Sequence, residues 1–208
     1  MRKAREFGLC IDWETSGSTW GGDSTREYQG LSFGAIVFDL SDFSTVQELY
    51  TEIQFDSSKY KWSTEAEHIH GLSRQHLADA GVSQQDAAIA LAELILKYWG
   101  PSSKVMLLGH NTTFDLRFTN QLLNSIDIEF SIEKCTQFDS WIQVHHVLLD
   151  TSSAGFISFG ISKSNALFKH VGFVDRAEHN ALEDARLTLN TAACIRALVD
   201  SAYENLQA

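Results

Sequence analysis

The alternation of apolar and polar positions predicts three strands at the start of the chain. A short apolar run lies around Ile11, residues 31–40 are apolar on both alternating sets, and residues 48–55 alternate polar with apolar side chains. The second pattern is typical of a buried strand and the third of a more exposed one. We expect the three strands to pair as an antiparallel meander.

A periodicity near 3.6 residues predicts a helix further along the chain. Ser83 and Asp86 have the spacing of a capping box, and Gly100 followed by Pro101 stops the pattern. Between them, apolar residues recur at helical spacing: Ala88, Ile89, Ala92, Leu96 and Trp99. Residues 63–80, just before this helix, predict an irregular or short helical segment.

The middle of the chain predicts one strand and two more helices. Residues 105–108 form a short apolar strand, after which Thr112 can cap a helix that carries Phe114, Phe118, Leu122 and Leu123. Asp139 can cap a further helix with Trp141, Val144 or His145, and Leu148 on its apolar side. Residues 151–162 are rich in Gly and Ser and predict a long connection.

The last part of the chain is predicted to be helical. Residues 164–171 predict a short helix closed by Gly172, and Asn180 with Glu183 has the spacing of a capping box that starts a helix to about Asp200. Strands first, then strand and helix in alternation, predict an α/β fold with helices packed on a mixed sheet. With 208 residues, 44% of them hydrophobic, we expect residues 1–208 to form a single domain.

Charge and cysteine content narrow the function. A net charge of -11, from 27 acidic and 16 basic residues, argues against a protein that coats duplex nucleic acid, but it allows a nuclease that holds a single-stranded end. Cys10, Cys135 and Cys194 lack the spacing of a disulfide framework or a zinc site. With no signal peptide or membrane span in the sequence, we expect a cytoplasmic protein.

Carboxylates occur where several elements begin or end. In a strand, Asp12 and Glu14 project on the same face, where their mutual repulsion favours a divalent cation between them. Asp115 lies at the start of the helix that follows residues 105–108. Asp184 lies about one turn into the last helix, and His179 immediately precedes the cap of that helix.

These residues form three motifs that together resemble a known superfamily. Asp12-x-Glu14, His110-Asn111-x-x-Phe114-Asp115 and His179-x-Ala181-x-x-Asp184-Ala185 resemble, in order and spacing, the DEDD 3′–5′ exonucleases of the His-containing (DEDDh) subtype. This group includes the proofreading exonuclease subunit of bacterial replicative polymerase, ribonuclease T and oligoribonuclease. The segment His70-Gly71-Leu72-Ser73 also resembles one common in the proofreading branch.

The resemblance implies a ribonuclease H-like fold with a mixed five-stranded sheet, and it implies a two-metal site. Asp12, Glu14 and Asp184 would hold one divalent ion, and Asp12 with Asp115 the second. Oxygen ligands suit Mg²⁺ or Mn²⁺, and His179 would act as general base. The partner would be the 3′ end of single-stranded DNA or RNA, with DNA slightly favoured, and the product would be a nucleoside 5′-monophosphate.

Substrate contacts are expected from Thr15, Trp20, His70 and Asn111. Trp20 or Tyr28 could stack on a base, or both could pin residues 16–30 to the body. This long loop departs from the family pattern, which has an apolar residue where Ser18 stands.

Several alternatives stay open at this point. His68, His70, His145 and His146 could suggest a zinc site, although no Cys or acidic partner stands at ligand spacing. Lys163, Lys169 and Arg176 could touch phosphates or be solvated surface charges. The chain could also be a non-catalytic nucleic-acid or protein-binding module that retains the nuclease fold, and its oligomeric state, with a homodimer as one option, is open.

Overall fold

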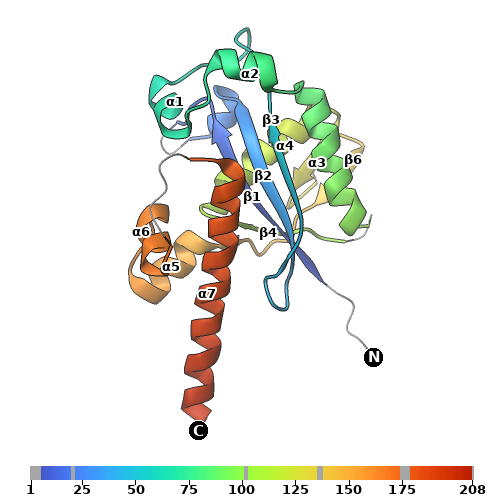
Figure 1. The fold of residues 1–208 in the computed structure, drawn as a ribbon. Helices are drawn as coiled ribbons and strands as arrows, with labels where there is room; N and C mark the ends of the chain where they lie inside the picture. Colours follow the sequence, from blue (N-terminus) through green and yellow to red (C-terminus); the bar gives the residue numbers. More distant parts are fainter. Residues whose placement is uncertain (1–5, 20–21, 101–102, 135–137, 174–178, 208) are drawn as a thin grey trace.

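Five strands form one mixed sheet in the order β3-β2-β1-β4-β7 (Figure 1). A computed structural model describes residues 6–19, 22–100, 103–134, 138–173 and 179–207. β1 pairs antiparallel with β2 and parallel with β4, while β2–β3 is antiparallel and β4–β7 parallel. The strands are β1 (Phe7–Thr15), β2 (Gly30–Asp39), β3 (Thr45–Glu52), β4 (Met106–Gly109) and β7 (Leu149–Asp150). The predicted meander and the predicted five-stranded mixed sheet are confirmed.

Helices cover both faces of the sheet, and the alternation along β1 decides which residue meets which helix. Leu9, Ile11 and Trp13 are buried in the core shared with α3 (Gln84–Tyr98) and α4 (Thr112–Asn124). Cys10 is buried on the opposite face, against α7 (Ala181–Gln207). Trp13 therefore faces the core, on the side of β1 opposite to Asp12 and Glu14.

The cap predicted at Ser83, at the start of α3, is present, but the predicted buried face of α3 is partly wrong. Ser83 Oγ accepts from the backbone N–H of Asp86 at 3.1 Å. Ile89 and Leu96 are 42% and 56% exposed. α3 has more apolar positions than one face can hold, and packing against the sheet determines which of them are buried. The buried residues of α3 are Ala87, Ala88, Leu91, Ala92, Leu94 and Ile95.

Residues 63–80 form two short helices, α1 (Thr64–His70) and α2 (Arg74–Ala80). Ser63 and Ser73 cap their N-termini, each accepting a backbone N–H from three residues ahead. Gly71 ends α1 with φ 72°, a left-handed conformation that favours glycine.

The helix predicted after Asp139 is wrong. Residues in this segment form β6 (Ser140–Gln143), which pairs parallel with β5 (Ile128–Ser131). Ile142 and Val144 are buried, two residues apart, so the apolar pattern has the period of a strand. β5 supplies the backbone hydrogen bonds of β6, and the sequence of this segment alone does not reveal that partner strand.

Two further predictions in this part of the chain are also wrong. The expected connection over residues 151–162 contains α5 (Thr151–Phe159), which begins where Asp150 Oδ1 accepts from the N–H groups of Ser152 and Ser153. Gly155, which made the segment look like a loop, lies where the side chain of Leu167 leaves no room for a Cβ. Thr112 does not cap α4, because its hydroxyl donates to the Leu149 carbonyl at 2.7 Å.

The last two predicted helices are present as α6 (Ser164–His170) and α7. α7 continues past the predicted end near Asp200 to Gln207 and projects from the body of the molecule (Figure 1). Among the helices of the described residues, none is both long and apolar enough to cross a membrane.

Candidate active site

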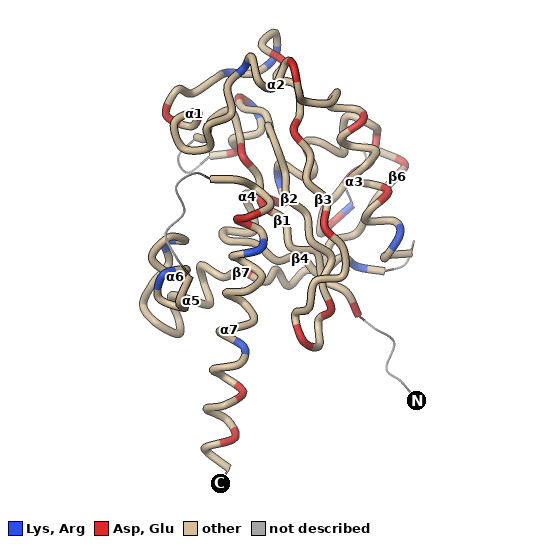
Figure 2. Tube along the Cα trace, viewed as in Figure 1, with Lys and Arg blue, Asp and Glu red and all other residues tan. Residues whose placement is uncertain are grey.

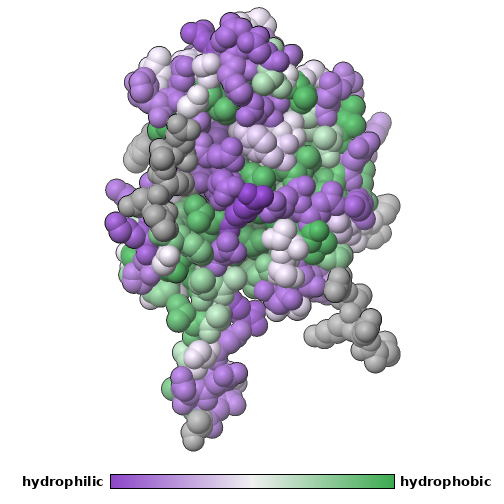
Figure 3. All heavy atoms as spheres, viewed as in Figure 1, coloured by the Kyte–Doolittle hydropathy of each residue, from purple (hydrophilic) through white to green (hydrophobic). Residues whose placement is uncertain are grey.

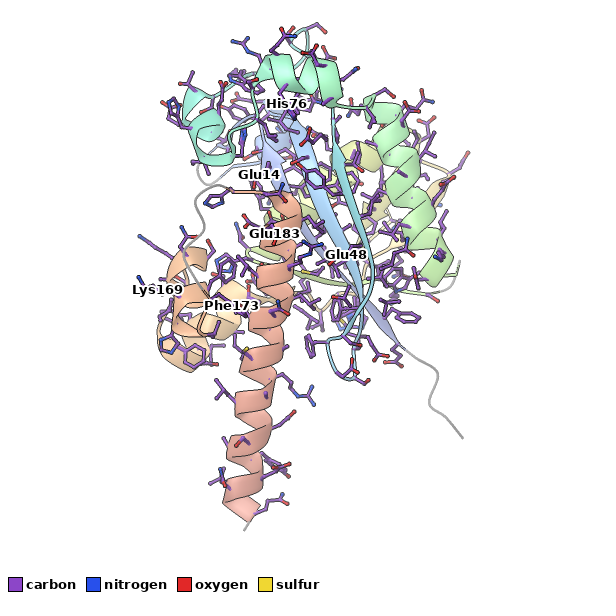
Figure 4. All side chains as sticks on the ribbon, viewed as in Figure 1. Glu14, Glu48, His76, Lys169, Phe173 and Glu183 are labelled. Atoms are coloured by element: carbon purple, nitrogen blue, oxygen red, sulfur yellow. The ribbon has the colours of Figure 1, made fainter. Side chains whose placement is uncertain are left out.

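β1 brings two carboxylates to the end of the sheet. Asp12 and Glu14 lie on the face that α7 covers, and Glu14 is 7% exposed. In Figure 4, Glu14 projects toward the N-terminal end of α7, near which Glu183 also lies. The side-by-side arrangement expected from strand geometry places both acids where the last helix begins.

Gly34 allows α7 to approach this end of the sheet. It pairs with Asp12 in the β1–β2 register. A Cβ at Gly34 would lie 2.3 Å from the Cα of Leu182 and 2.4 Å from the carbonyl oxygen of Ala181. The backbone of the first turn of α7 therefore rests directly on β2, one strand away from Asp12.

Capping and an ion pair fix the orientation of α7. Asn180 Oδ1 accepts from the N–H groups of Leu182 and Glu183, at 3.1 and 3.2 Å, so the predicted cap is present. Arg186 binds Glu183 on its own helix and Glu48 on β3, and its guanidinium lowers the pKa of the Glu48 carboxyl. Asp184 is held between these two anchors and is 4% exposed.

His179 lies beside Asp184, just outside the helix. Its Nδ1 is 3.2 Å from Asp184 Oδ2, and its backbone N–H donates to the Ile69 carbonyl at 3.3 Å. One ligand atom from each of Glu14, His179 and Asp184 lies within 4.8 Å of the other two. The third motif thus meets the first motif directly.

Asp115 enters the site from the first turn of α4. It is 2% exposed, and its Oδ2 accepts no hydrogen bond from the described residues. Burial, followed by the negative charge of Asp12, raises the pKa of this carboxyl well above its usual range. Asp115 is tied to the core because its carbonyl accepts from Thr119, whose hydroxyl accepts in turn from Trp13 Nε1 at 3.0 Å.

The three motifs converge on one cavity of about 180 Å³. The five residues that the motifs predicted all line it: Asp12, Glu14, Asp115, His179 and Asp184. The other lining residues are Trp13, His110, Phe114, Ser164, Phe168 and Thr188. Four carboxyl groups around so small a volume repel one another strongly unless cations separate them.

The chemistry of this cavity fits divalent metal ions. The four carboxylates offer hard oxygen ligands, which Mg²⁺ and Mn²⁺ prefer. Two buried oxygens that line it, Asp115 Oδ2 and Thr188 Oγ1, have no hydrogen-bond partner among the described residues. A buried acceptor without a donor is costly, and a cation or its bound water would satisfy it.

The residues expected to contact substrate divide into three groups. Thr15 and His70 line a second cavity of about 410 Å³, which Glu14 and Phe114 also line. Burial lowers the pKa of His70, which favours a neutral ring. Asn111 is exposed, adopts φ 65° before α4, and does not line the cavity of about 180 Å³, while Trp20 lies outside the described residues.

Sequence reasoning missed several residues of the site. Thr188 lies four residues after Asp184 on the same face of α7, so helical spacing could have found it. Gly34 interrupts an apolar strand, which is a signal for close backbone approach. Ser164 and Phe168 lie on α6, which the tertiary fold places beside the cavity, and no pattern in the sequence around them predicts this position.

The other histidines do not form a metal centre within the described ranges. The only group there of three or more ligating side chains within metal-binding distance is that of Glu14, His179 and Asp184. The rings of His145 and His146 stack on each other with centroids 4.4 Å apart. Cys10 is a buried core residue: its thiol donates to the Ala185 carbonyl, and burial raises its pKa.

Comparison with known proteins identifies the fold. No protein-family model matches the chain, and no curated protein matches it in sequence. Solved structures of 3′–5′ exonucleases do match: E. coli exonuclease I, in its zinc-bound complex with single-stranded DNA, aligns with a TM-score of 0.71 and 18% identity. That alignment covers 97% of this chain and 43% of the exonuclease I chain, so this chain spans less than half of that protein.

Two shorter structures match over most of their own length. The nuclease domain of 3′hExo, a DEDDh family member bound to rAMP, aligns with a TM-score of 0.65 and 13% identity, covering 96% of this chain and 95% of that one. A 3′-exonuclease that recognises the 3′ end of a histone mRNA stem-loop aligns with the same TM-score and identity, over 95% and 84%. The ribonuclease H-like fold predicted from the three motifs is confirmed.

Proposed function

We propose that residues 1–208 form a single exonuclease domain, which removes nucleoside 5′-monophosphates from the 3′ end of single-stranded nucleic acid in a metal-dependent reaction. The observation that carries this proposal is the meeting of Asp12, Glu14, Asp115, Asp184 and His179 in one small cavity. The fold shared with 3′–5′ exonucleases supports it.

The carboxylates would hold two divalent ions, Mg²⁺ or Mn²⁺. Asp12, Glu14 and Asp184 would hold one ion, and Asp12 with Asp115 the other. Bound there, the ions supply charge stabilisation for the attacking and the leaving oxygen of an in-line displacement at phosphorus. The raised pKa of Asp115 fits this role, because a cation is what would keep that buried carboxyl ionised.

His179 accepts the proton of the attacking water. Its Nδ1 faces Asp184 Oδ2, an arrangement that orients the ring and leaves Nε2 as the basic atom. The Ile69 carbonyl holds the backbone of His179 through the second hydrogen bond described above. Proton transfer therefore depends on α1 and α7 together.

The second cavity, lined by Thr15 and His70, would receive the terminal nucleoside. We favour DNA over RNA because His70-Gly71-Leu72-Ser73 resembles the proofreading branch of the superfamily. Cys10 and Cys194 are free thiols, which suits the cytoplasmic setting that we propose.

The alternative, a non-catalytic binding module that retains the fold, has less support. A module that only binds nucleic acid has no need to keep four carboxyl groups together, three of them buried, since that arrangement costs stability without cations. All five groups of the resemblance are present and share one cavity.

A digestion assay tests the proposal. With Mg²⁺, purified protein should shorten a 5′-labelled single strand one nucleotide at a time from the 3′ end, and EDTA should stop it. Asp115→Ala should abolish nucleotide release, whereas Asp79→Ala, at an exposed position on α2, serves as the matched control. Release that persists unchanged in Asp115→Ala would refute the two-metal site, and matched DNA and RNA strands would settle the sugar preference.

A homodimer is a further part of the proposal. The projecting half of α7 exposes large apolar side chains, among them Leu198, Tyr203 and Leu206 at 54%, 62% and 85%, and Figure 3 shows hydrophobic residues on α7 close to α5 and α6. Exposed apolar area of this kind is typical of a contact surface. Light scattering after gel filtration would report the molar mass, and a monomer at high concentration would exclude the dimer.

A further inference from the structure

A further pocket, of about 540 Å³, is distinct both from the catalytic cavity and from the cavity lined by Thr15 and His70. Its charged residues are mostly basic, and we call it the basic pocket. Arg26, Lys59 and Arg117 line it, with Asp23 as its one acidic residue. The chain as a whole carries a charge of -11, with 16 basic and 27 acidic residues. Figure 2 marks the basic residues in blue and the acidic ones in red along the chain. A local excess of positive charge is therefore a departure from the rest of the molecule.

The long loop after β1 forms one wall of this basic pocket, and α4 holds that loop in place. Gln121 Nε2 donates to the carbonyls of Thr25 and Tyr28, both at 2.8 Å, and Gln121 Oε1 accepts from the Gly30 N–H. Arg117 donates to the Gly22 carbonyl at 3.2 Å. The described part of the loop includes a short 3-10 helix, η1 (Ser24–Arg26), and it is thus docked on α4.

The floor of the basic pocket has a polar group that lacks a partner. Asn124 Oδ1 is buried and accepts no hydrogen bond from the described residues. Asn120, Gln121 and Ser125 also line the pocket with groups that can donate or accept. Buried polar atoms are normally satisfied, so water or a bound ligand is expected here.

α4 connects the basic pocket to the catalytic cavity. Phe114, Arg117, Gln121 and Asn124 follow one another at spacings of three and four residues, so they share one face of the helix. Phe114 lines the catalytic cavity, while the other three line the basic pocket. From Phe114 to Asn124 the helix rises about 15 Å, a distance that a few nucleotides of a single strand can span.

We propose that the basic pocket binds phosphodiester groups of the substrate strand on the 5′ side of the scissile bond. This inference rests on the proposed exonuclease function, because a strand whose 3′ end lies in the catalytic cavity can extend only through its 5′ side. Arg117 and Arg26 offer planar donors to phosphate oxygens, and Lys59 offers a point charge. The side-chain amides on α4 can hydrogen-bond to sugar or phosphate oxygens.

A pair of charge-removing substitutions tests the site. Among the described residues, the side chain of Arg26 forms an ion pair with Asp23 at 3.7 Å, and Lys59, which is exposed, lies over the ring of Tyr60 at 5.0 Å. The double variant Arg26→Gln, Lys59→Gln should therefore fold normally. Binding is measured by fluorescence anisotropy in EDTA, with a labelled single strand of about twelve nucleotides.

The double variant should bind this strand roughly 3- to 30-fold more weakly than the unchanged protein. The slope of log affinity against log salt should become shallower by about 1.4, since two phosphate contacts are lost. Cleavage of a dinucleotide, which cannot reach the basic pocket, should keep its rate. Arg196→Gln with Lys97→Gln, which removes the same charge from α7 and α3, should change neither affinity nor slope.

Two outcomes would overturn this proposal. One is an unchanged affinity and salt slope in the Arg26, Lys59 double variant. The other is an equal loss of affinity and salt slope in the double variant Lys163→Gln, Lys169→Gln, with Arg26 and Lys59 unchanged. Those two lysines lie on the α6 side of the catalytic cavity, so this result would mean that the strand leaves the cavity on that side. Binding in EDTA does not require catalysis, so failure of the exonuclease proposal would show instead as absent dinucleotide cleavage with binding intact.

Discussion

Replacement of Gly34 by alanine would push α7 away from the carboxylates of β1. The added Cβ would lie 2.3 Å from the Cα of Leu182, where carbon atoms normally keep about 3.5 Å, so one backbone must shift by about 1.2 Å. The contact is with backbone atoms, which cannot rotate aside as a flexible side chain would. Asp184, two residues along α7 from Leu182, would move with the helix.

We expect two measurable effects of Gly34→Ala. Overpacking of this kind costs about 1–3 kcal/mol of unfolding free energy, which urea titration would measure. Displacement of a catalytic group by about 1 Å can cost about 100-fold in rate, so Mg²⁺-dependent nucleotide release should fall by about that factor while the protein stays folded.

Gly100→Ala is the matched control, because a Cβ at Gly100 meets no atom within 4 Å. It should leave both rate and stability nearly unchanged. If Gly34→Ala released nucleotides within about threefold of the unchanged protein, the close approach of α7 would not be what positions Asp184.

Three further predictions concern single side chains. In EDTA, Asp115→Asn should raise the thermal midpoint near neutral pH. The raised pKa of Asp115 means that the protonated carboxyl contributes stability below its usual pKa of about 3.9, and that this contribution is lost as pH rises through the folded-state pKa. Melting curves at acid pH should therefore show no gain from the substitution. His179→Ala should lower the rate of nucleotide release roughly 10²- to 10⁴-fold while Mg²⁺ still raises the melting temperature; loss of the metal effect would contradict its assignment as base. Trp13→Phe, which removes the hydrogen bond to Thr119, should cost about 0.5–1.5 kcal/mol in urea titration without abolishing activity, and an inactive but stable variant would show that Trp13 does more than pack.

Local physical chemistry accounts for the parts of this protein that the sequence predicted correctly. Strand alternation put Asp12 and Glu14 on one face and Trp13 on the other, since successive side chains of a strand point to opposite sides. Ser83 and Asn180 were recognised as caps because their oxygens satisfy backbone N–H groups a few residues ahead. Short-range rules of this kind need no knowledge of the fold.

Tertiary contacts decided what the sequence left open or suggested wrongly. Residues 140–143 are a strand because β5 lies alongside, and Gly155 is tolerated within α5 because α6 needs the space. The buried face of α3 was selected by the sheet, which left Ile89 and Leu96 in solvent. Each of these outcomes depends on a partner distant in sequence, which no local pattern encodes.

The site itself shows the same division. Residue types and spacing along the chain identified the five side chains that we propose carry the chemistry. Only the packing of α4 and α7 on the sheet determined that these five side chains meet in a cavity of about 180 Å³. Gly34, which has no Cβ, lets α7 approach the sheet, and the packing of α4 buries Asp115. Likewise, the loop after β1 was visible as an unusual segment, but its docking on α4 through Gln121 is what builds a basic pocket beside the acidic one.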